Sequence, residues 1–355
     1  MYRTPRSEPL TQPRTTRSDA PAHAPDRTPC LAPNRANEEL QSIVLSGLLH
    51  KPKRLPCKLL YDERGSELFE KICEQPEYYL TRTELQIMQT FSSEMASALG
   101  PDIMLMEYGS GSSLKTRLLL NALEHPAVYV PVDISSSALS ASVASLRCEF
   151  PDLTVNPLCA DFTQPFGALP CALRKPAHAL TQPDHARRTV VYFPGSTIGN
   201  FAATEAVRLL RQIRLQMGST GGALIGFDLK KAFGLIERAY NDEAGYTAAF
   251  TLNLLQRLNR ELCADFDLSN FQHSAKYRHD PGCIETHIIS QRDQHVAIAG
   301  ESVHFESGEE MLVEISCKYS MQDFAELAAA AGLRMDAYWT DPQNRFCVQY
   351  LVNSP

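Results

Sequence analysis

The run of residues 103–111, Ile-Met-Leu-Met-Glu-Tyr-Gly-Ser-Gly, constrains the fold of this chain more than any other feature. It predicts a buried strand that ends in an acid and opens into a turn, where Gly109 and Gly111 let a ligand approach the backbone closely. A helix is predicted over about 113–123, with Leu114 among the residues at core spacing. This order indicates a nucleotide cradle, although many buried strands without a ligand also end in glycine-rich turns.

Two further strand ends carry acids. A second apolar run ends in Asp133, and a short run over 153–158 is followed by Asp161 and Phe162. In a doubly wound sheet, an acid at the tip of the second strand faces a cofactor ribose, and its oxygens can accept both hydroxyl hydrogens. Asp161 suits an adenine amino group, with Phe162 beside the base. Asp133 could instead cap a helix over 135–149, and one aspartate can do both.

The glycine turn differs from the turns of other nucleotide-binding motifs. The segment Gly-Ser-Gly-Ser-Ser-Leu lacks the third glycine of the dinucleotide motif and the basic ending of a P-loop. The strand and turn together resemble E-x-G-x-G, the first motif of S-adenosylmethionine-dependent methyltransferases. That resemblance implies S-adenosyl-L-methionine as the cofactor.

Strands alternating with helices over most of the chain predict an α/β fold, a Rossmann-like class I methyltransferase sheet that is mostly parallel with an antiparallel C-terminal strand. Between about 231 and 317 the pattern changes to long helices and then alternating strands, which predicts a smaller α+β substrate-binding lobe. We assign 38–81 and 231–317 to that lobe, and 82–230 and 318–355 to the methyltransferase domain. The expected elements are strands over 128–133, 189–193, 222–229, 334–340 and 346–352, and helices over 204–217 and 321–331.

Composition narrows the class of protein. Residues 1–37 are rich in proline and arginine, which favours a disordered tail over a transit peptide. The net charge is −7 without a basic cluster in the folded part, which argues against nucleic-acid binding. No apolar run is long enough to span a membrane. The 10 cysteines form no metal-ligand spacing and suggest neither a metal site nor disulfides, so we expect a cytoplasmic protein. We also expect a monomer.

Five segments narrow the resemblance to one family. They are 61–69, 76–84, 194–200, 239–242 and 308–318, and they read YDERGSELF, PEYYLTRTE, PGSTIGN, AYND and GEEMLVEISCK. Together they closely resemble the L-histidine Nα-methyltransferases of ergothioneine biosynthesis. The similarity runs from about residue 40 to the C-terminus, and several motifs in matching order are more specific than a shared fold.

The resemblance implies an activity and a set of contacts. Members of this family transfer three methyl groups to the α-amino group of L-histidine and form hercynine. Asn200 and Tyr240 would hold the amino-acid end, and Glu314 and Ser316 the imidazole. The positions that match cofactor contacts are Gly109, Lys115, Asp133, Asp161 and Phe162; those that match the histidine pocket are Tyr61, Phe69, Tyr78, Asn200, Tyr240, Glu314 and Ser316, with Gly195 and Thr197 in the turn between the two sites.

The residue types agree with these roles. Glu314 and Ser316 lie two apart on an expected strand and therefore face the same side. A carboxylate and a hydroxyl side by side can bind the two nitrogens of an imidazole. The same pair could form an exposed polar strand face, and Asn200 could serve only as a turn residue. Tyr240, like Tyr78, could equally be a packing residue with a hydrogen-bonded hydroxyl.

Thr286 departs from the family pattern, since actinobacterial members carry a methionine against the substrate ring at this position. A methyltransferase of the same fold that acts on another amino acid or imidazole amine therefore stays an alternative. A binding module without turnover is a second alternative, which the complete set of substrate-side residues disfavours. No dedicated strong base is expected, because an α-amino group loses its proton near pH 8. Positioning by Tyr61 and Asn200 is expected instead.

Overall fold

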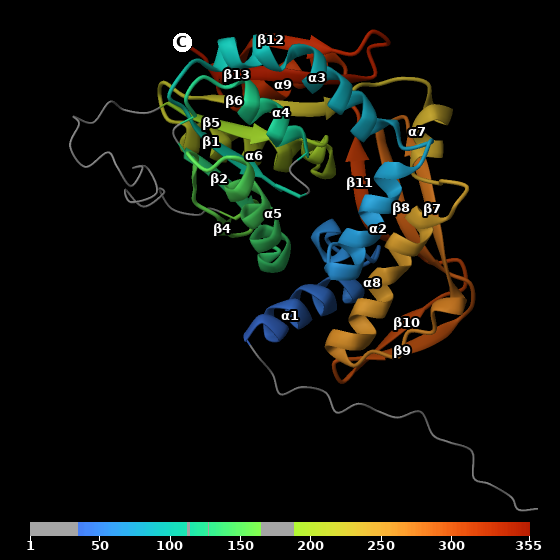
Figure 1. Ribbon diagram of the computed structural model, residues 1–355. Helices are drawn as coiled ribbons and strands as arrows, with labels where there is room; N and C mark the ends of the chain where they lie inside the picture. Colours follow the sequence, from blue (N-terminus) through green and yellow to red (C-terminus); the bar gives the residue numbers. More distant parts are fainter. Residues whose placement is uncertain (1–34, 112–113, 127, 165–187) are drawn as a thin grey trace, which may run out of the picture.

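The computed structural model describes residues 35–111, 114–126, 128–164 and 188–355, and Figure 1 shows two bodies joined side by side. One body is built on a large sheet with helices on both faces. The other combines helices with small antiparallel sheets. Residues 1–34 of the expected tail lie outside the described part, whereas residues 35–37 belong to a helix and not to the tail.

The large sheet has eight strands and is mostly parallel. Its strands are β1 (Met104–Tyr108), β2 (Val128–Asp133), β3 (Thr154–Val155), β4 (Leu158–Cys159), β5 (Thr189–Phe193), β6 (Gly222–Asp228), β12 (Leu333–Thr340) and β13 (Phe346–Asn353). Their order is β12-β13-β6-β5-β1-β2-β3, with β4 also beside β2. Strand β13 is antiparallel to both of its neighbours. The predicted sheet and its antiparallel C-terminal strand are confirmed.

Helices cover both faces of this sheet because successive side chains of each strand point to opposite sides. On β1, Leu105 packs under one helical layer, whereas Met104 and Met106 pack under the other. The first layer comprises α3 (Tyr79–Leu99), α4 (Leu114–Ala122) and α5 (Ser136–Glu149), and the second α6 (Ala203–Met217) and α9 (Met321–Ala330). The prediction that Leu114 faces the core is wrong. This side chain stands on the first turn of α4 and is 51% exposed.

The second body has a hydrophobic core of its own, formed by buried residues from 40–80 and 236–313. Its elements are helices α1 (Arg35–Leu49), α2 (Glu63–Glu74), α7 (Phe233–Ala239) and α8 (Tyr246–Leu262), 3-10 turns η1 (Cys57–Leu60) and η4 (Leu268–Asn270), and strands β7 (Phe271–Arg278), β8 (Cys283–Ser290), β9 (Gln294–Ile298), β10 (Glu301–Phe305) and β11 (Glu310–Cys317). Strands β11, β8 and β7 form one antiparallel sheet, and β10 and β9 another. In Figure 1, β11 runs toward the large sheet, so its C-terminal end lies where the two bodies meet.

One expected strand is broken. The run over 153–158 forms two short strands, β3 and β4, which pair with different parts of β2. Pro157 lies between them and has no N–H to donate to a ladder. Among the described residues, no helix is both long and apolar enough to cross a membrane.

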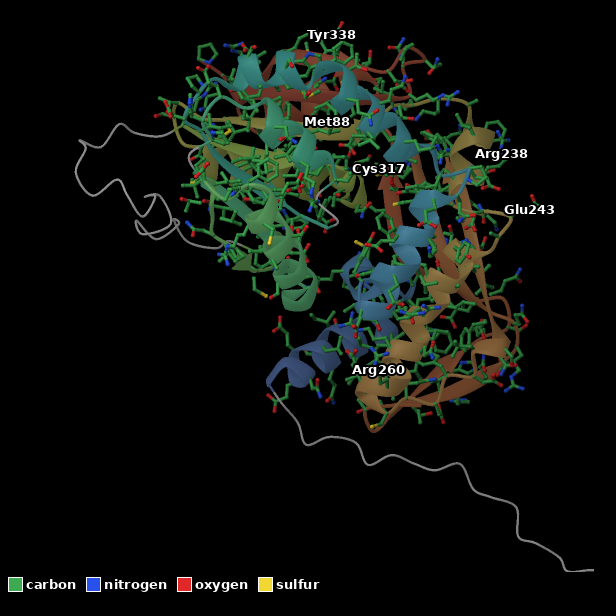
Figure 2. The ribbon with its side chains drawn as sticks, in the orientation of Figure 1. Met88, Arg238, Glu243, Arg260, Cys317 and Tyr338 are labelled. Carbon is green, nitrogen blue, oxygen red and sulfur yellow. A yellow bond between two sulfur atoms is a disulfide. The ribbon has the colours of Figure 1, made fainter. Side chains whose placement is uncertain are left out.

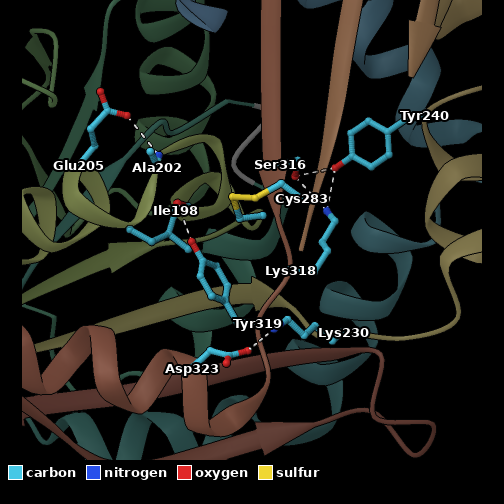
Figure 3. The surroundings of a disulfide bond; sticks show 11 residues. Ile198, Ala202, Glu205, Lys230, Tyr240, Cys283, Ser316, Lys318, Tyr319 and Asp323 are labelled. Atoms are coloured by element: carbon cyan, nitrogen blue, oxygen red, sulfur yellow. Dashed lines mark hydrogen bonds and ion pairs between the residues drawn. A yellow bond between two sulfur atoms is a disulfide. The ribbon is translucent and has the colours of Figure 1, made fainter. Parts of the chain in front are cut away.

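The expectation that the cysteines form no disulfide is wrong. Cys283 and Cys317 are bonded, and they are direct partners in the antiparallel register of β8 and β11. They lie 34 residues apart in the sequence, so no local spacing signals the pair. Figure 2 places Cys317 at the junction of the two bodies, and Figure 3 shows the bond beside Ser316 and Lys318.

Candidate active site

The glycine turn after β1 has the shape of a cradle. Gly109 has φ 71°, a left-handed conformation that a residue with a Cβ adopts only with strain. A Cβ at this position would point at the ring of Phe162, 3.9 Å away. Phe162 itself stacks on Tyr108 with ring centroids 5.3 Å apart. The turn therefore offers open backbone next to a supported aromatic face.

Asp133 lies at the tip of β2. This strand pairs in parallel with β1, so Asp133 lies at the same edge of the sheet as the glycine turn. One of its carboxylate oxygens accepts the backbone N–H of Ser135 at 2.9 Å. Among the described residues its other oxygen has no hydrogen-bond partner. Asp133 thus steadies the start of α5 and keeps one oxygen available at the strand tip, which fits the ribose of S-adenosylmethionine.

Glu107, the acid at the end of β1, is buried beneath the glycine turn. Both of its oxygens accept hydrogen bonds from the Thr116 hydroxyl, at 2.8 and 2.7 Å, and one also accepts from Tyr129. Burial raises the pKa of Glu107 to about 7, although these hydrogen bonds oppose the change. Both carboxylate oxygens of Glu107 thus accept hydrogen bonds from residues of the same body. We interpret Glu107 as a support beneath the glycine turn.

Lys115 stands on α4 and is paired with Glu84 of α3 at 2.5 Å. The Glu84 carboxylate also accepts the backbone N–H of Gly195, at 3.0 and 3.1 Å to its two oxygens. The turn after β5 is therefore tied to the cofactor half through one buried acid. Thr197, in the same turn, donates its hydroxyl to the Pro194 carbonyl at 3.0 Å.

Asp161 forms an ion pair across the two bodies. Its carboxylate accepts from Lys58 of η1 at 2.9 Å and from the backbone and hydroxyl of Thr163. Burial would raise its pKa, but these partners outweigh burial and lower it. Beside this pair is a crevice of about 360 Å³, whose lining includes Tyr61 and Ile134. The crevice runs from the strand tips to the second body.

Four predicted aromatic residues form one continuous cluster on the second body. Tyr61 and Phe69 meet edge to face at 5.6 Å between centroids, and Phe69 and Tyr78 at 6.0 Å. Tyr78 in turn meets Tyr240 at 6.1 Å. Burial raises the pKa of each of the three tyrosine hydroxyls, so all three are neutral near pH 7.

Glu314 of β11 lies deep between this cluster and β8. It is surrounded by protein, yet part of its surface remains accessible to water. Burial raises its pKa to about 7, while Lys318 and the hydroxyl of Thr286 act to lower it. Thr286 is its direct partner across the strands and is fully buried. The Thr286 hydroxyl faces Glu314 too loosely for hydrogen-bond geometry and has no partner among the described residues.

Ser316 lies two residues after Glu314 on β11, on the same face of the strand, and belongs to a polar cluster. Its hydroxyl accepts from the Tyr240 hydroxyl at 2.8 Å and from the Lys318 ammonium at 2.9 Å (Figure 3). Lys318 also donates to the Tyr240 oxygen at 3.0 Å and contacts Asp228 at 3.2 Å. Tyr240 was expected at the amino-acid end of the pocket. Its hydroxyl contacts Ser316, the residue expected at the imidazole.

Asn200 reaches this region through the turn after β5, the 3-10 turn η3 (Thr197–Asn200). Gly199 allows that turn to lie against β11, because a Cβ there would come within 2.6 Å of the Cys317 carbonyl. The Asn200 side chain faces the thiol of Cys57, whose pKa burial raises to about 12. The turn thus joins the cofactor half to the surroundings of Glu314, whose charge also acts on Cys57.

The profile of one protein family, described as "Histidine-specific methyltransferase, SAM-dependent", matches residues 40–353. The chain belongs to this family. It is 40% identical to the histidine N-alpha-methyltransferase of Mycolicibacterium smegmatis over 91% of this chain and 97% of that protein. It is 39% identical to the protein of the same name from Mycobacterium tuberculosis, over 86% of this chain and 92% of that protein. It is also 30% identical to ergothioneine biosynthesis protein 1 of Neurospora crassa, over 81% of this chain and 32% of that protein.

As a member of this family, the protein is an S-adenosylmethionine-dependent methyltransferase. The strand tips fit that cofactor, because Gly109 leaves backbone open beside Phe162 and Asp133 keeps an oxygen available. The described residues contain no group of three or more His, Cys, Asp and Glu side chains that could hold a metal ion.

Sequence reasoning missed four groups that the structure brings to the site. They are Cys57, which lies beside Asn200; Lys58 and Glu84, which form ion pairs with Asp161 and Lys115 respectively; and Lys318, which donates to Ser316. A signal was present for Lys318, since positions 314, 316 and 318 alternate as residues on one face of a strand do. The other three contacts join distant parts of the chain and have no local pattern.

Proposed function

We propose that this protein transfers three methyl groups from S-adenosyl-L-methionine to the α-amino group of L-histidine and forms hercynine. The observation that carries the proposal is the pair of Glu314 and Ser316 on one face of β11, beside Tyr61 and Tyr240 of the aromatic cluster. An ionised carboxylate accepts an imidazole N–H, and a hydroxyl can donate to the other ring nitrogen. The names of the relatives support the same substrate.

Each half has a role in this proposal. Gly109, Lys115, Asp133, Asp161 and Phe162 hold the cofactor, and the lobe of residues 38–81 and 231–317 holds the amino acid. Tyr61, Phe69, Tyr78 and Tyr240 enclose the substrate, and Gly195 and Thr197 shape the turn between the two ligands. Asn200 has both a donor and an acceptor, so it can bind the amino-acid end of histidine.

S-adenosylmethionine supplies an electrophilic methyl carbon, so the protein mainly has to hold the amine in line with it. The neutral amine is the reactive form, and it is populated near pH 8 without a strong base. The neutral hydroxyls of Tyr61, Tyr78 and Tyr240 can relay the released proton, each accepting one proton as it donates its own. Tyr61 and Asn200 position the amine.

Repeated transfer requires that the substrate stay anchored while its amine changes. Each added methyl removes an N–H, so contacts to the amine weaken from one step to the next. Contacts of Glu314 and Ser316 to the ring persist through all three steps. Anchoring at the imidazole therefore lets one pocket accept the unmethylated, monomethylated and dimethylated amino acid.

Mass spectrometry of the product tests this proposal. The purified protein, incubated with L-histidine and S-adenosylmethionine, should give histidine with three added methyl groups and no methyl on the ring. A fragment spectrum with methyl on the imidazole, or a product that stops at one methyl, would contradict it.

Thr286 supports one competing assignment, methylation of another amino acid or imidazole amine. Its side chain is smaller and more polar than the methionine that actinobacterial relatives carry. A panel of amino acids with labelled cofactor separates the two assignments. Preferred turnover of another amine over histidine would favour the alternative.

A further inference from the structure

Lys318 is a fully enclosed ammonium group at the junction of the two bodies, with no exposed side-chain surface. Its three donors are all used, on the Tyr240 oxygen at 3.0 Å, the Ser316 oxygen at 2.9 Å and the Asp228 carboxylate at 3.2 Å. Burial acts to lower its pKa, but Tyr240 and Asp228 outweigh burial and raise it. Lys318 therefore carries its charge near pH 7.

This arrangement limits what Ser316 can do. A serine hydroxyl has one proton to donate and two lone pairs that accept. Tyr240 and Lys318 occupy the two lone pairs, at 2.8 and 2.9 Å (Figure 3). The hydroxyl proton of Ser316 is then the part left for a ligand. Glu314, when ionised, offers only acceptors.

We infer that Lys318 is a positioning residue that makes Ser316 a hydrogen-bond donor, so that Ser316 and Glu314 together select a neutral imidazole ring. This inference rests on the proposed function. A neutral imidazole presents one lone pair and one N–H, which match Ser316 and Glu314 respectively. An imidazolium presents two N–H groups, and one of them would meet the Ser316 proton.

Asp228 holds Lys318 in place. This acid ends β6 and also accepts from Lys231 at 2.6 Å and from the Tyr79 hydroxyl at 2.7 Å. Its backbone N–H donates to the hydroxyl of Ser196, in the turn after β5, at 2.9 Å. The position of the ring-binding pair is thereby tied to the sheet that holds the cofactor. The in-line geometry needs this link, because ring and methyl donor are bound by different bodies.

The full-length Lys318→Met variant tests the inference. The unbranched side chain fills the same space without a donor, and Asp228 keeps Lys231 and Tyr79 as partners. By calorimetry we expect histidine to bind about 10- to 100-fold more weakly, and S-adenosylhomocysteine within about threefold of the original protein. Lys230→Met is the matched control, since Lys230 is a half-exposed neighbour paired with Asp323, and it should leave both affinities unchanged.

A double-mutant cycle with Ser316→Ala separates positioning from a merely structural role. If Lys318 acts through Ser316, Lys318→Met should cost little further histidine affinity once Ser316 is alanine. Losses that add in full would overturn the inference. So would a folded Lys318→Met protein that binds histidine normally, or one that loses both ligands equally.

The pH dependence gives a second readout. The groups that titrate around Glu314 are Cys57, Tyr61, Tyr78 and Tyr240, which burial keeps neutral near pH 7, and Lys318. Histidine binding should strengthen as pH rises through about 7, because Glu314 ionises. Loss of the Lys318 charge raises the pKa of Glu314, so this rise should move to higher pH in Lys318→Met. An unmoved profile would contradict the inference.

A measurement on the unaltered protein covers the case in which Lys318→Met does not fold. A pyrrole analogue of histidine keeps a ring N–H and lacks the ring lone pair. We expect it to bind at least about tenfold more weakly than histidine, because the Ser316 proton is left without an acceptor. Equal binding would overturn the inference while leaving the proposed function intact. Failure of histidine itself to bind would instead refute the proposed function.

Discussion

The two bodies each contain a glutamate whose pKa burial raises to about 7, and the two differ in what surrounds them. Glu107 lies under the glycine turn and takes hydrogen bonds from Thr116 and Tyr129. Glu314 lies between the aromatic cluster and β8 in the second body, where its threonine neighbour Thr286 makes no hydrogen bond within the described residues. Burial thus serves two purposes. Glu107, which has hydrogen-bond partners, supports the glycine turn, and Glu314, which lacks them among the described residues, keeps its acceptor oxygens for a ligand.

Replacing Glu314 should give the largest effect and should separate the two halves. In Glu314→Ala the imidazole N–H loses its acceptor, so we expect histidine affinity to fall by about 10²- to 10³-fold. Cofactor affinity should stay within about threefold. Calorimetry with each ligand measures both. Equal losses for the two ligands would mean that Glu314 supports the fold in the way Glu107 does.

The two acids also predict how stability depends on pH. Each has an ordinary pKa of 4.5 and a folded pKa of about 7, so between these values the folded state binds more protons than the unfolded state. The free energy of unfolding should therefore fall as pH rises from about 4.5 to 7. Glu314→Gln should reduce this fall by up to about 3 kcal/mol, as followed by urea unfolding at pH 5 and 7. An unchanged pH dependence would show that Glu314 ionises normally.

Asp133 provides the reciprocal test in the cofactor half. Asp133→Asn weakens the acceptor for a ribose hydroxyl, so we expect cofactor affinity to fall by about 10- to 100-fold. Histidine affinity, measured alone, should be unchanged, because Asp133 ends a strand of the large sheet whereas Glu314 lies in the second body. Asp152→Asn, on the surface, is the control. A selective loss of histidine binding would break the division of roles.

The two threonines that face these acids should give the smallest effects, of opposite sign. Thr116→Val removes hydrogen bonds to Glu107 and should lower the free energy of unfolding by about 1 to 3 kcal/mol. Thr286→Val replaces a buried hydroxyl without a partner, so stability should be unchanged or rise by about 1 kcal/mol. Urea unfolding of both variants measures the difference. Equal destabilisation would show that Thr286 is bonded to Glu314.

Much of the fold follows from local patterns. The runs that predict β1, β2, β5, β12 and β13 match the observed strands to within about one residue, because each is a short apolar segment between polar turns. The predictions fail at two places. Leu114 has core spacing but lies on an exposed helix turn, and Pro157 interrupts a run that reads as one strand.

The candidate site divides in the same way. The acids at strand tips are visible in the sequence because a strand end is a local event. The residues that pair with the site side chains are not visible in the sequence. Lys58 and Asp161 lie 103 residues apart, and Glu84 and Lys115 lie 31 apart. The Cys283–Cys317 bond belongs to this second group, because only the register of two strands brings its cysteines together.

By itself, the sequence determined the parallel sheet and which of its strand ends carry acids. It also determined that Glu314 and Ser316 share one face of a strand. All of these depend on neighbours along the chain. Only the tertiary structure decided that the Glu107 carboxylate receives hydrogen bonds from the protein, whereas the Glu314 carboxylate keeps acceptors for a ligand. It also decided that Ser316 meets Lys318 and Tyr240, because a hydrogen-bond pattern depends on groups brought together from distant segments. Burial, and with it the pKa of each acid, exists only once those segments have packed.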